Sequence, residues 1–189
     1  MTRIKPLSFE ELDNKFKKKL NNAKSIMGYT PNDGLTLARI PGLIEGLNKL
    51  TFSIYGDDGY VSNEIKYLIS ILSSIKSGSG YCSAHTVHGA SKLGIDKNKI
   101  ENIKNFKKSD LFSNKEKAAL SIVEEANQIP INVSNRAFSA LRLYFDDNQI
   151  CEIIAVISLF GFLNKWNGIM KTELEVIPKS IFEKYEFKK

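Results

Sequence analysis

The sequence has only two cysteines among its 189 residues, Cys82 and Cys151. Two cysteines are too few for a disulfide scaffold, because small disulfide-stabilised proteins carry several bridges. The opening stretch, MTRIKPLSFEELDNKF, lacks the apolar segment and the small-residue cleavage site of a signal peptide. We therefore expect a cytoplasmic protein whose thiols are reduced.

Long apolar runs and basic recognition motifs are also scarce. The longest apolar run, from Ile153 to Leu163, is shorter than the roughly 18 to 20 residues that span a bilayer, so we expect a buried helix and no membrane partner. Lys and Arg exceed Asp and Glu by 27 to 21, and the excess gathers near the two ends of the chain. Such runs are usually solvated helix faces, and no aromatic-interleaved basic motif appears, so no nucleic-acid partner is predicted.

Strand patterns are missing as well, since no segment alternates apolar and polar residues over the length of a strand. Helical spacing dominates instead and predicts an all-α fold. A chain of 189 residues with 42% hydrophobic content is long enough for one buried core. We expect a single domain over residues 1–189, with its core at about 28–168 and a C-terminal tail at about 172–189.

Capping and breaking residues predict where the helices begin and end. Ser8 and Glu11 match the pattern of a capping box that opens a helix, and Gly28 is typical of a helix end. Two further helices are expected to meet near Ile40, with Pro41 in the first turn of the second. The helices are expected at about 8–27, at two segments within 35–56, and at 63–78, 81–93, 97–105, 114–128, 134–144 and 147–171.

Two of the apolar stretches resemble each other. YLISILSSI from Tyr67 and EIIAVISLF from Glu152 match at nearly every apolar place when shifted by 85 residues. Apolar helices resemble one another by default, so the match leaves two interpretations, an ancestral repeat of a helix pair or coincidence. The predicted fold is a multi-helix bundle, and an internal repeat of a helix pair is one of two interpretations of its sequence.

Both histidines of the chain, His85 and His88, lie within seven positions of Cys82. Residues three apart on an α-helix are neighbours, so the thiol and the two imidazoles are expected to share one helix face. In one interpretation an imidazole takes or shares the thiol proton. Cys82 would then be a thiolate nucleophile in the first turn of a helix, where unpaired backbone N–H groups favour an anion.

Two other interpretations of this cluster were weighed. Cys82 could be a small buried hydrophobe beside histidines that bond to nearby carbonyls. Cysteine and histidine are also zinc ligands, but no fourth ligand is spaced to complete a local site. We therefore predict no metal and no cofactor.

Three stretches of the chain carry a family resemblance. The first resembles a G-x-x-P-N turn segment and reads MGYTPNDGLTLARIPGLIEGLNKL. The second resembles an E-x(11)-C-x-x-C-x-x-x-H redox motif and reads EIKYLISILSSIKSGSGYCSAHTVHGA. The third resembles a closing helix and reads LRLYFDDNQICEIIAVISLFGFLNKW. Together, over roughly Gly28 to Trp166, the chain resembles the carboxymuconolactone decarboxylase-like superfamily, above all its alkylhydroperoxidase D-like and peroxidase-related branch. The resemblance implies an all-helical homo-oligomer. It also implies kinship with enzymes that reduce hydroperoxides through paired cysteines.

The redox motif is degenerate, because SxxC replaces CxxC. Cys82 takes the place of the second cysteine of the motif, and the first falls on Ser79. A disulfide between neighbouring thiols is therefore impossible, and Ser79 could only hydrogen-bond the thiolate.

The acid–base positions of the motif are replaced too. Its general-base glutamate falls on Tyr67, and the nearest carboxylate on that helix is Glu64, one turn earlier. Its histidine falls on Thr86, while His85 matches the first histidine of the pair often found in peroxidase-related members. Glu64 is the candidate substitute for the missing base if its helix face points toward the thiol.

Three functions follow from these residues. The first is a thiol-dependent peroxidase in which Cys82 reduces a small hydroperoxide and an external thiol or a protein reductant restores it. The second is a non-redox enzyme of the carboxymuconolactone decarboxylase type, with His85 or His88 acting on a small lactone or acid. The third is an oligomeric binding protein whose catalytic motif has decayed.

Cys151 is expected to be a buried structural cysteine, because Ile150, Ile153 and Ile154 surround it in the sequence. A role in resolving oxidised Cys82 is the alternative. Under the peroxidase hypothesis, Cys82 should be the thiol that peroxide oxidises quickly.

Overall fold

The structure is a computed structural model that describes residues 2–40 and 42–188. Pro41, predicted to begin a helix, lies outside the described residues. The helices are α1 (Asn14–Met27), α2 (Asn32–Leu37), α3 (Leu43–Tyr55), α4 (Asn63–Lys76), α5 (Gly80–Leu93), α6 (Lys97–Glu101), a 3₁₀ turn η1 (Ile103–Asn105), α7 (Asn114–Ala126), α8 (Asn135–Arg142), α9 (Asp147–Met170) and α10 (Val176–Phe182). No strand occurs within those two ranges, so the all-α prediction is confirmed.

The first helix begins later than predicted. Asp13 caps α1 by accepting a hydrogen bond from the backbone N–H of Phe16, whereas Ser8 and Glu11 form only a turn before it. The reason is that the Asp13 carboxylate satisfies a free backbone N–H of the first helical turn, which places the helix start at Asn14. The predicted end of α1 is confirmed, since Gly28 has the left-handed φ of 89°.

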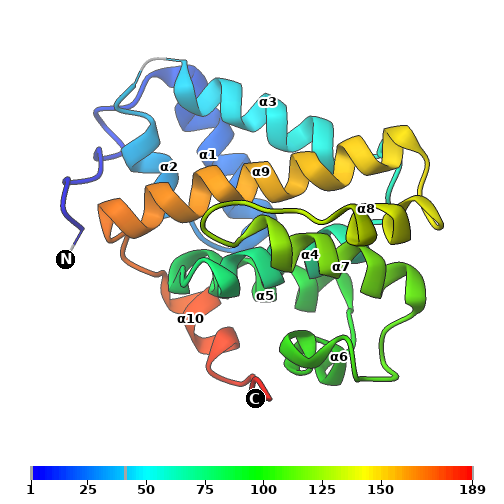
Figure 1. The fold of residues 1–189 in the computed structure, drawn as a ribbon. Helices are drawn as coiled ribbons and strands as arrows, with labels where there is room; N and C mark the ends of the chain where they lie inside the picture. The colour runs from blue at the N-terminus through cyan, green and yellow to red at the C-terminus, as the bar shows by residue number, and fades with distance from the viewer. Residues whose placement is uncertain (1, 41, 189) are drawn as a thin grey trace.

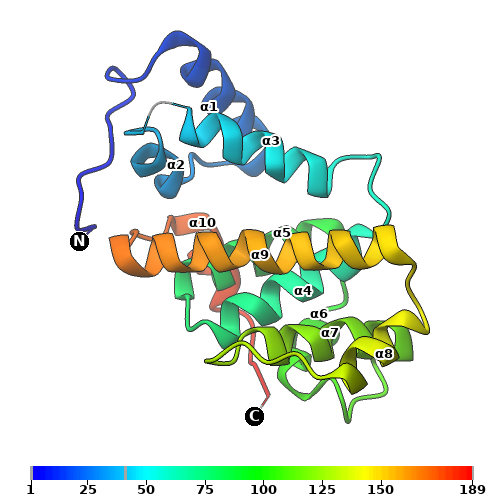
Figure 2. The ribbon, with the colours of Figure 1, turned by 45° about the horizontal axis from the view of Figure 1, so that its top comes forward.

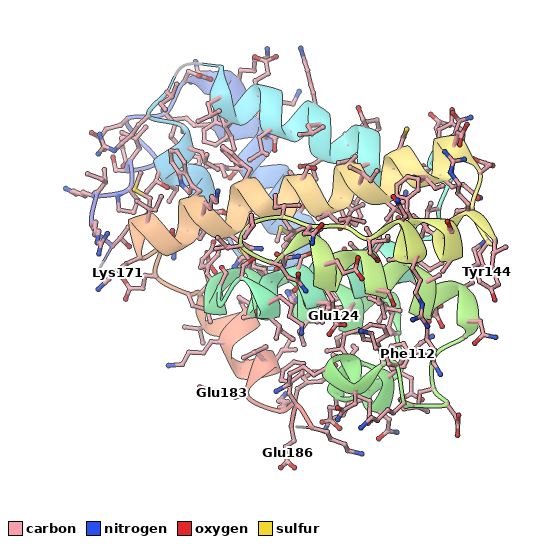
Figure 3. The ribbon with its side chains drawn as sticks, viewed as in Figure 1. Phe112, Glu124, Tyr144, Lys171, Glu183 and Glu186 are labelled. Carbon is pink, nitrogen blue, oxygen red and sulfur yellow. The ribbon has the colours of Figure 1, made fainter. Side chains whose placement is uncertain are left out.

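Helix α9 divides the molecule into two parts. Figures 1 and 2 show α1, α2 and α3 on one side of α9, and α4, α5, α7 and α8 on the other. Side chains from both parts fill the space around α9, and Lys171 in the left-handed conformation ends it (Figure 3). The main core forms where α4 packs against α5, α7 and α9, which places α5 beside the C-terminal half of α9.

The prediction that residues 153–163 form a buried helix is only half correct. Ile153 and Val156 of α9 are buried, but Ile154 and Phe162 are exposed on the opposite face. Within the described residues, α9 is the one helix whose length and hydropathy would allow it to cross a membrane. It contacts five other helices, α3, α4, α5, α7 and α8, so the bundle itself accounts for much of its apolar character.

A groove of about 560 Å³ lies between α3 and α9. Leu47, Leu50 and Phe162 contribute apolar side chains to it, and Leu50 and Phe162 are exposed. A second copy of the chain would cover such a face, in line with the predicted homo-oligomer, which stays a prediction.

The segment predicted as a tail takes part in the fold. Helix α10 packs against α5, and the residues between α9 and α10 lie over the N-terminal half of α5. The predicted helix-pair repeat is not visible in the architecture. Helix α4 ends before Gly78 and a new helix follows, whereas α9 runs unbroken through Leu163, the counterpart of Gly78.

Candidate active site

Cys82 lies in the first turn of α5, as the sequence predicted. Gly78, with a left-handed φ of 68°, turns the chain sharply after α4, and Ser79 caps the new helix. The Ser79 hydroxyl accepts a hydrogen bond from the backbone N–H of Cys82 at 3.4 Å. Ser79 therefore orients the helix start around the thiol.

The thiol of Cys82 is buried, with 3% of the residue exposed. Burial raises the pKa of the Cys82 thiol to about 11, and the charge of Asp33 also raises it. Hydrogen bonds from Ser79 and from the side-chain amide of Asn167 act in the opposite direction but do not outweigh burial. The expectation of a thiolate at rest is therefore wrong. Desolvation of the anion outweighs the favourable helix N-terminus.

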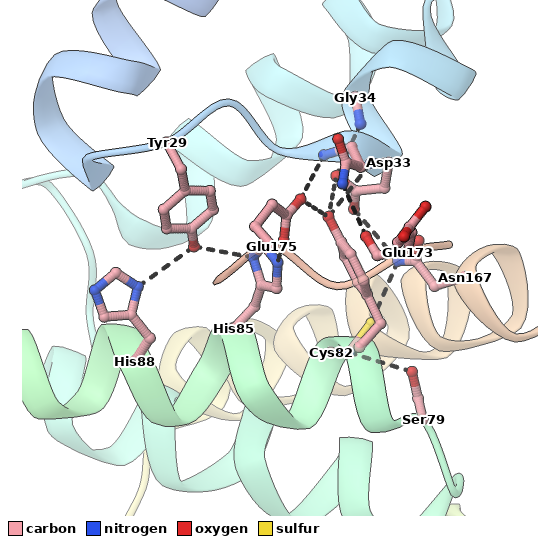
Figure 4. A network of polar contacts seen from close by, with 12 residues as sticks. Tyr29, Asp33, Gly34, Ser79, Cys82, His85, His88, Asn167, Glu173 and Glu175 are labelled. Atoms are coloured by element: carbon pink, nitrogen blue, oxygen red, sulfur yellow. Dashed lines mark hydrogen bonds and ion pairs between the residues drawn. The ribbon is translucent and has the colours of Figure 1, made fainter. Parts of the chain in front are cut away.

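His85 does not act directly on the sulfur. Its Nε2 lies 2.6 Å from the Glu175 carboxylate, and its Nδ1 lies 3.2 Å from the Tyr29 hydroxyl (Figure 4). The same hydroxyl lies 3.3 Å from Nδ1 of His88, so one tyrosine bridges the two histidines. Neither imidazole shares a hydrogen bond with Cys82 among the described residues, and the expected Cys–His pair is not formed.

Glu175 comes from the segment that was predicted to be a tail. Its Oε1 accepts hydrogen bonds from the Tyr81 hydroxyl at 2.8 Å and from the backbone N–H of Asn32 at 2.6 Å. Burial alone would raise the pKa of Glu175, but the hydrogen bond and charge of His85 and the backbone N–H of Asn32 lower it below its usual value. Glu175 is therefore a carboxylate that holds α5, the start of α2 and the C-terminal segment together.

Asp33 and Asn167 complete the polar network on the side of the sulfur. Asn167 of α9 donates from Nδ2 to Cys82 Sγ at 3.4 Å and to Asp33 Oδ2 at 3.3 Å. The other oxygen of Asp33 accepts from the Tyr81 hydroxyl at 3.3 Å and from the backbone N–H of Gly34 at 2.8 Å. Figure 4 shows these residues converging on Cys82 from α2, α5 and α9.

A cavity of about 290 Å³ opens beside Cys82. Its walls are mostly aromatic and apolar, a composition typical of small-molecule sites. The lining residues are Met27, Asp33, Thr51, Tyr55, Tyr67, Tyr81, Cys82, His85, Thr86, Phe160 and Leu163. A flat apolar molecule in this space would lie against the sulfur.

Tyr67 and Gly89 shape the far wall of this cavity. A Cβ atom at Gly89 would lie 2.4 Å from the Tyr67 ring, so the glycine allows that ring to pack directly on α5. Beyond Tyr67 a second cavity of about 410 Å³ is lined by Tyr29, His88 and other residues. Tyr67 and His85 line both cavities.

The structure brings most of the predicted site residues together. Cys82, His85, Tyr67 and Thr86 line one cavity, and His88 lines the adjoining one. The Thr86 hydroxyl donates to the backbone carbonyl of Cys82 at 2.9 Å, which is an intrahelical bond and gives Thr86 no acid–base contact.

Glu64 does not join the site. Its side chain is 47% exposed and pairs with Lys99 at 2.7 Å. Tyr67 of the same helix lines the cavity beside Cys82, whereas the Glu64 side chain points toward Lys99 of α6. The hypothesis that Glu64 replaces the missing base is not supported by this geometry.

Cys151 is exposed, contrary to the expectation of a buried structural cysteine. It lies near the start of α9, sixteen residues before Asn167, the residue that contacts Cys82. At about 1.5 Å of rise per residue, roughly 24 Å of helix separates the two positions. Cys151 therefore cannot resolve oxidised Cys82 within one folded chain.

The Cys151 thiol should be more reactive than the Cys82 thiol, which is the reverse of the order predicted from the sequence. At neutral pH a thiol of pKa about 11 contains roughly 300-fold less thiolate than a free cysteine. Its thiolate is intrinsically more nucleophilic, but this compensates for only part of the lower thiolate concentration. Iodoacetamide should therefore alkylate Cys82 at least about 20-fold more slowly than Cys151. Peptide mass spectrometry of timed samples at pH 7.5 measures both rates. Equal rates would show that the Cys82 thiol is neither buried nor suppressed.

Several known proteins share this architecture. The C82A variant of the debrominase Bmp8, in complex with 2,3,4-tribromopyrrole, superposes with a TM-score of 0.87 at 27% identity over 97% of each chain. Ligand-free Bmp8 gives 0.88 at 26% identity over 100% of this chain and 99% of that chain. An uncharacterized peroxidase-related protein from Ralstonia eutropha, described as an alkylhydroperoxidase AhpD core, gives 0.84 at 18% identity over 94% of both chains.

Sequence comparison reaches less far. YdfG, an uncharacterized protein of Bacillus subtilis, is 26% identical over 116 residues, which are 61% of this chain and 77% of that protein. No family model matches the chain.

Proposed function

We propose that this chain, which resembles the carboxymuconolactone decarboxylase-like superfamily in sequence and shares the fold of AhpD-like and peroxidase-related proteins, is a thiol-dependent reductase of small molecules. The observation that carries the proposal is the position of Cys82. Its sulfur faces a cavity of about 290 Å³ and accepts a hydrogen bond from Asn167. A sulfur held by a fixed donor beside an enclosed space is arranged to react with a bound molecule rather than with bulk solvent.

The substrate we favour is a small halogenated aromatic molecule. Tyr55, Tyr67, Tyr81 and Phe160 surround the cavity with aromatic side chains, which suit a flat and apolar guest. Bmp8, similar to this chain over nearly its whole length, is a debrominase crystallised with a tribromopyrrole. The net reaction would replace one carbon–halogen bond by a carbon–hydrogen bond. Two thiols would become one disulfide, and hydrogen halide would be released.

A hydroperoxide is the second candidate substrate. The AhpD-like and peroxidase-related neighbours favour it, and the apolar walls would accept an organic hydroperoxide. Cys82 would take the terminal oxygen as a sulfenic acid and release an alcohol. An external thiol would then form a mixed disulfide with loss of water, and a second thiol would restore Cys82.

Both reactions need electrons from outside the chain. Cys151 lies too far along α9 to act, so a small thiol or a protein reductant must supply them. A reducing compartment such as the cytoplasm meets this need, and we retain it as the proposed location.

The substrate test is a parallel assay of the full chain with excess small thiol. We expect disulfide formation to depend on the added substrate, with one bromide released per disulfide when a polybrominated pyrrole is supplied. Turnover of cumene hydroperoxide without bromopyrrole turnover would favour the peroxidase. Failure to turn over either substrate would favour the non-redox enzyme or the decayed binding protein.

A further inference from the structure

The side chain of Asn167 connects the sulfur of Cys82 to a carboxyl group. Its Nδ2 is 3.4 Å from Cys82 Sγ and 3.3 Å from Asp33 Oδ2. Because both contacts share one nitrogen, the sulfur and that oxygen lie within 6.7 Å of each other. A substrate atom placed between them would therefore contact both groups.

Asp33 is the one carboxyl group among the described residues that line the cavity beside Cys82. Its position is set from three directions, by the backbone N–H of Gly34, the hydroxyl of Tyr81 and the amide of Asn167. Such fixed contacts leave the carboxyl pre-oriented toward the space where a substrate would bind (Figure 4). The family position for an acid–base residue holds Tyr67 here, so this chemistry has to come from another element.

We infer that Asp33 is the proton donor for the reaction at Cys82, an assignment that rests on the proposed function. In dehalogenation, the sulfur takes the halogen, the electron pair of the broken bond stays with the ring carbon, and Asp33 gives that carbon its proton. In hydroperoxide reduction, the sulfur takes the terminal oxygen with its hydrogen and Asp33 protonates the departing alkoxide. In both steps Cys82 reacts as the thiolate, after the proton of its thiol has passed to water. Either step leaves Asp33 as a carboxylate, and that proton returns through water to Asp33 before the next turnover.

The surroundings of Asp33 act on its pKa in both directions. Burial raises the pKa of Asp33, and the charge of Glu175 raises it as well. The charge of His85 and the hydrogen bond from Asn167 lower it, but burial is the larger effect. Among the described residues, the titratable groups that line the cavity with Asp33 and Cys82 are Tyr81 and His85 on α5, Tyr67 on α4 and Tyr55 on α3. Glu175 before α10 contacts Tyr81 and His85. Turnover by a protonated donor is full below its pKa and falls as the pH rises through it.

Asp33→Asn tests the donor because it keeps the shape and removes the exchangeable proton. We expect its turnover at pH 6 to be at least about 100-fold below wild type, with the loss of activity at rising pH no longer present. Asp33→Glu should recover part of the activity because it restores a carboxyl. Asp110→Asn makes the same change at an exposed site and should leave turnover unchanged. An Asp33→Asn protein that is folded and retains the wild-type pH profile would overturn the inference.

A second measurement needs no turnover. Ionised Asp33 raises the pKa of the Cys82 thiol, so Asp33→Asn should shift the pH midpoint of Cys82 alkylation downward. Both proteins would carry Cys151→Ser so that one thiol is measured, and circular dichroism would confirm that they are folded. An unchanged midpoint would refute the electrostatic effect of Asp33 on Cys82 whether or not either substrate turns over. A shifted midpoint without turnover in wild type would instead refute the proposed function.

Discussion

Replacing Cys82 by serine is expected to lower thiol-dependent turnover by at least about 1,000-fold. A serine hydroxyl keeps the shape and the hydrogen bond from Asn167, but it cannot accept a halogen or an oxygen atom reversibly and pass it to a thiol. Disulfide formation from added thiol measures the loss with either candidate substrate.

Cys151→Ser is the matched control for this variant. Cys151 is exposed and lies at the other end of α9, so its loss should leave turnover within a factor of two. If Cys82→Ser kept a tenth or more of the activity, the chemistry would not pass through the sulfur. The proposed role of Cys82 would then be wrong.

The buried pair of Lys66 and Glu152 predicts the largest change in stability. Lys66 is 1% exposed and Glu152 8%, and Lys66 Nζ lies 3.0 Å from Glu152 Oε1. The ammonium also donates to the backbone carbonyl of Ile54, and Glu152 Oε2 accepts from the backbone N–H of Val61. The pair therefore ties α4 and α9 to the end of α3 and to the loop that follows it.

Lys66→Met should lower the free energy of unfolding by about 3–5 kcal/mol, because it leaves the Glu152 carboxylate buried without a counter-charge. Urea denaturation followed by circular dichroism measures the change. Adding Glu152→Gln should recover part of the loss, since the amide oxygen can still accept from Val61 while the uncompensated charge is removed.

Lys76→Met on the same helix provides the control. Lys76 pairs with Glu124 at 2.9 Å, but its side chain is 39% exposed, so its removal should cost about 1 kcal/mol or less. A Lys66→Met protein as stable as the Lys76→Met protein would show that solvent reaches the Lys66–Glu152 pair.

The sequence by itself determined the class of fold and most helix boundaries. Ser62, Ser113 and Ser134 cap α4, α7 and α8, and Gly28 ends α1. These features depend on residues within one turn of each other, so local hydrogen bonding and helical spacing are enough to predict them. The placement of Cys82 at the start of a helix follows from the same local information.

Only the tertiary structure decided which side chains surround the sulfur. Asp33 lies within a stretch whose resemblance to the family was visible, and Asn167 directly follows another such stretch, yet nothing in their spacing pointed to Cys82. Glu175 lies beyond those stretches, and the sequence carried no signal for it. The three residues stand 49, 85 and 93 positions from Cys82 in the chain.

The state of the two thiols was decided by tertiary packing as well. Helix periodicity shows which residues share a face, but it does not show which partner helix that face meets or how much of it is covered. Cys82 is enclosed by α9 and the α1–α2 loop, and so its pKa rises, although its place at a helix N-terminus suggested a thiolate. Cys151 has apolar neighbours in sequence, yet it lies on the uncovered face of α9, because burial depends on contacts between segments far apart in the chain.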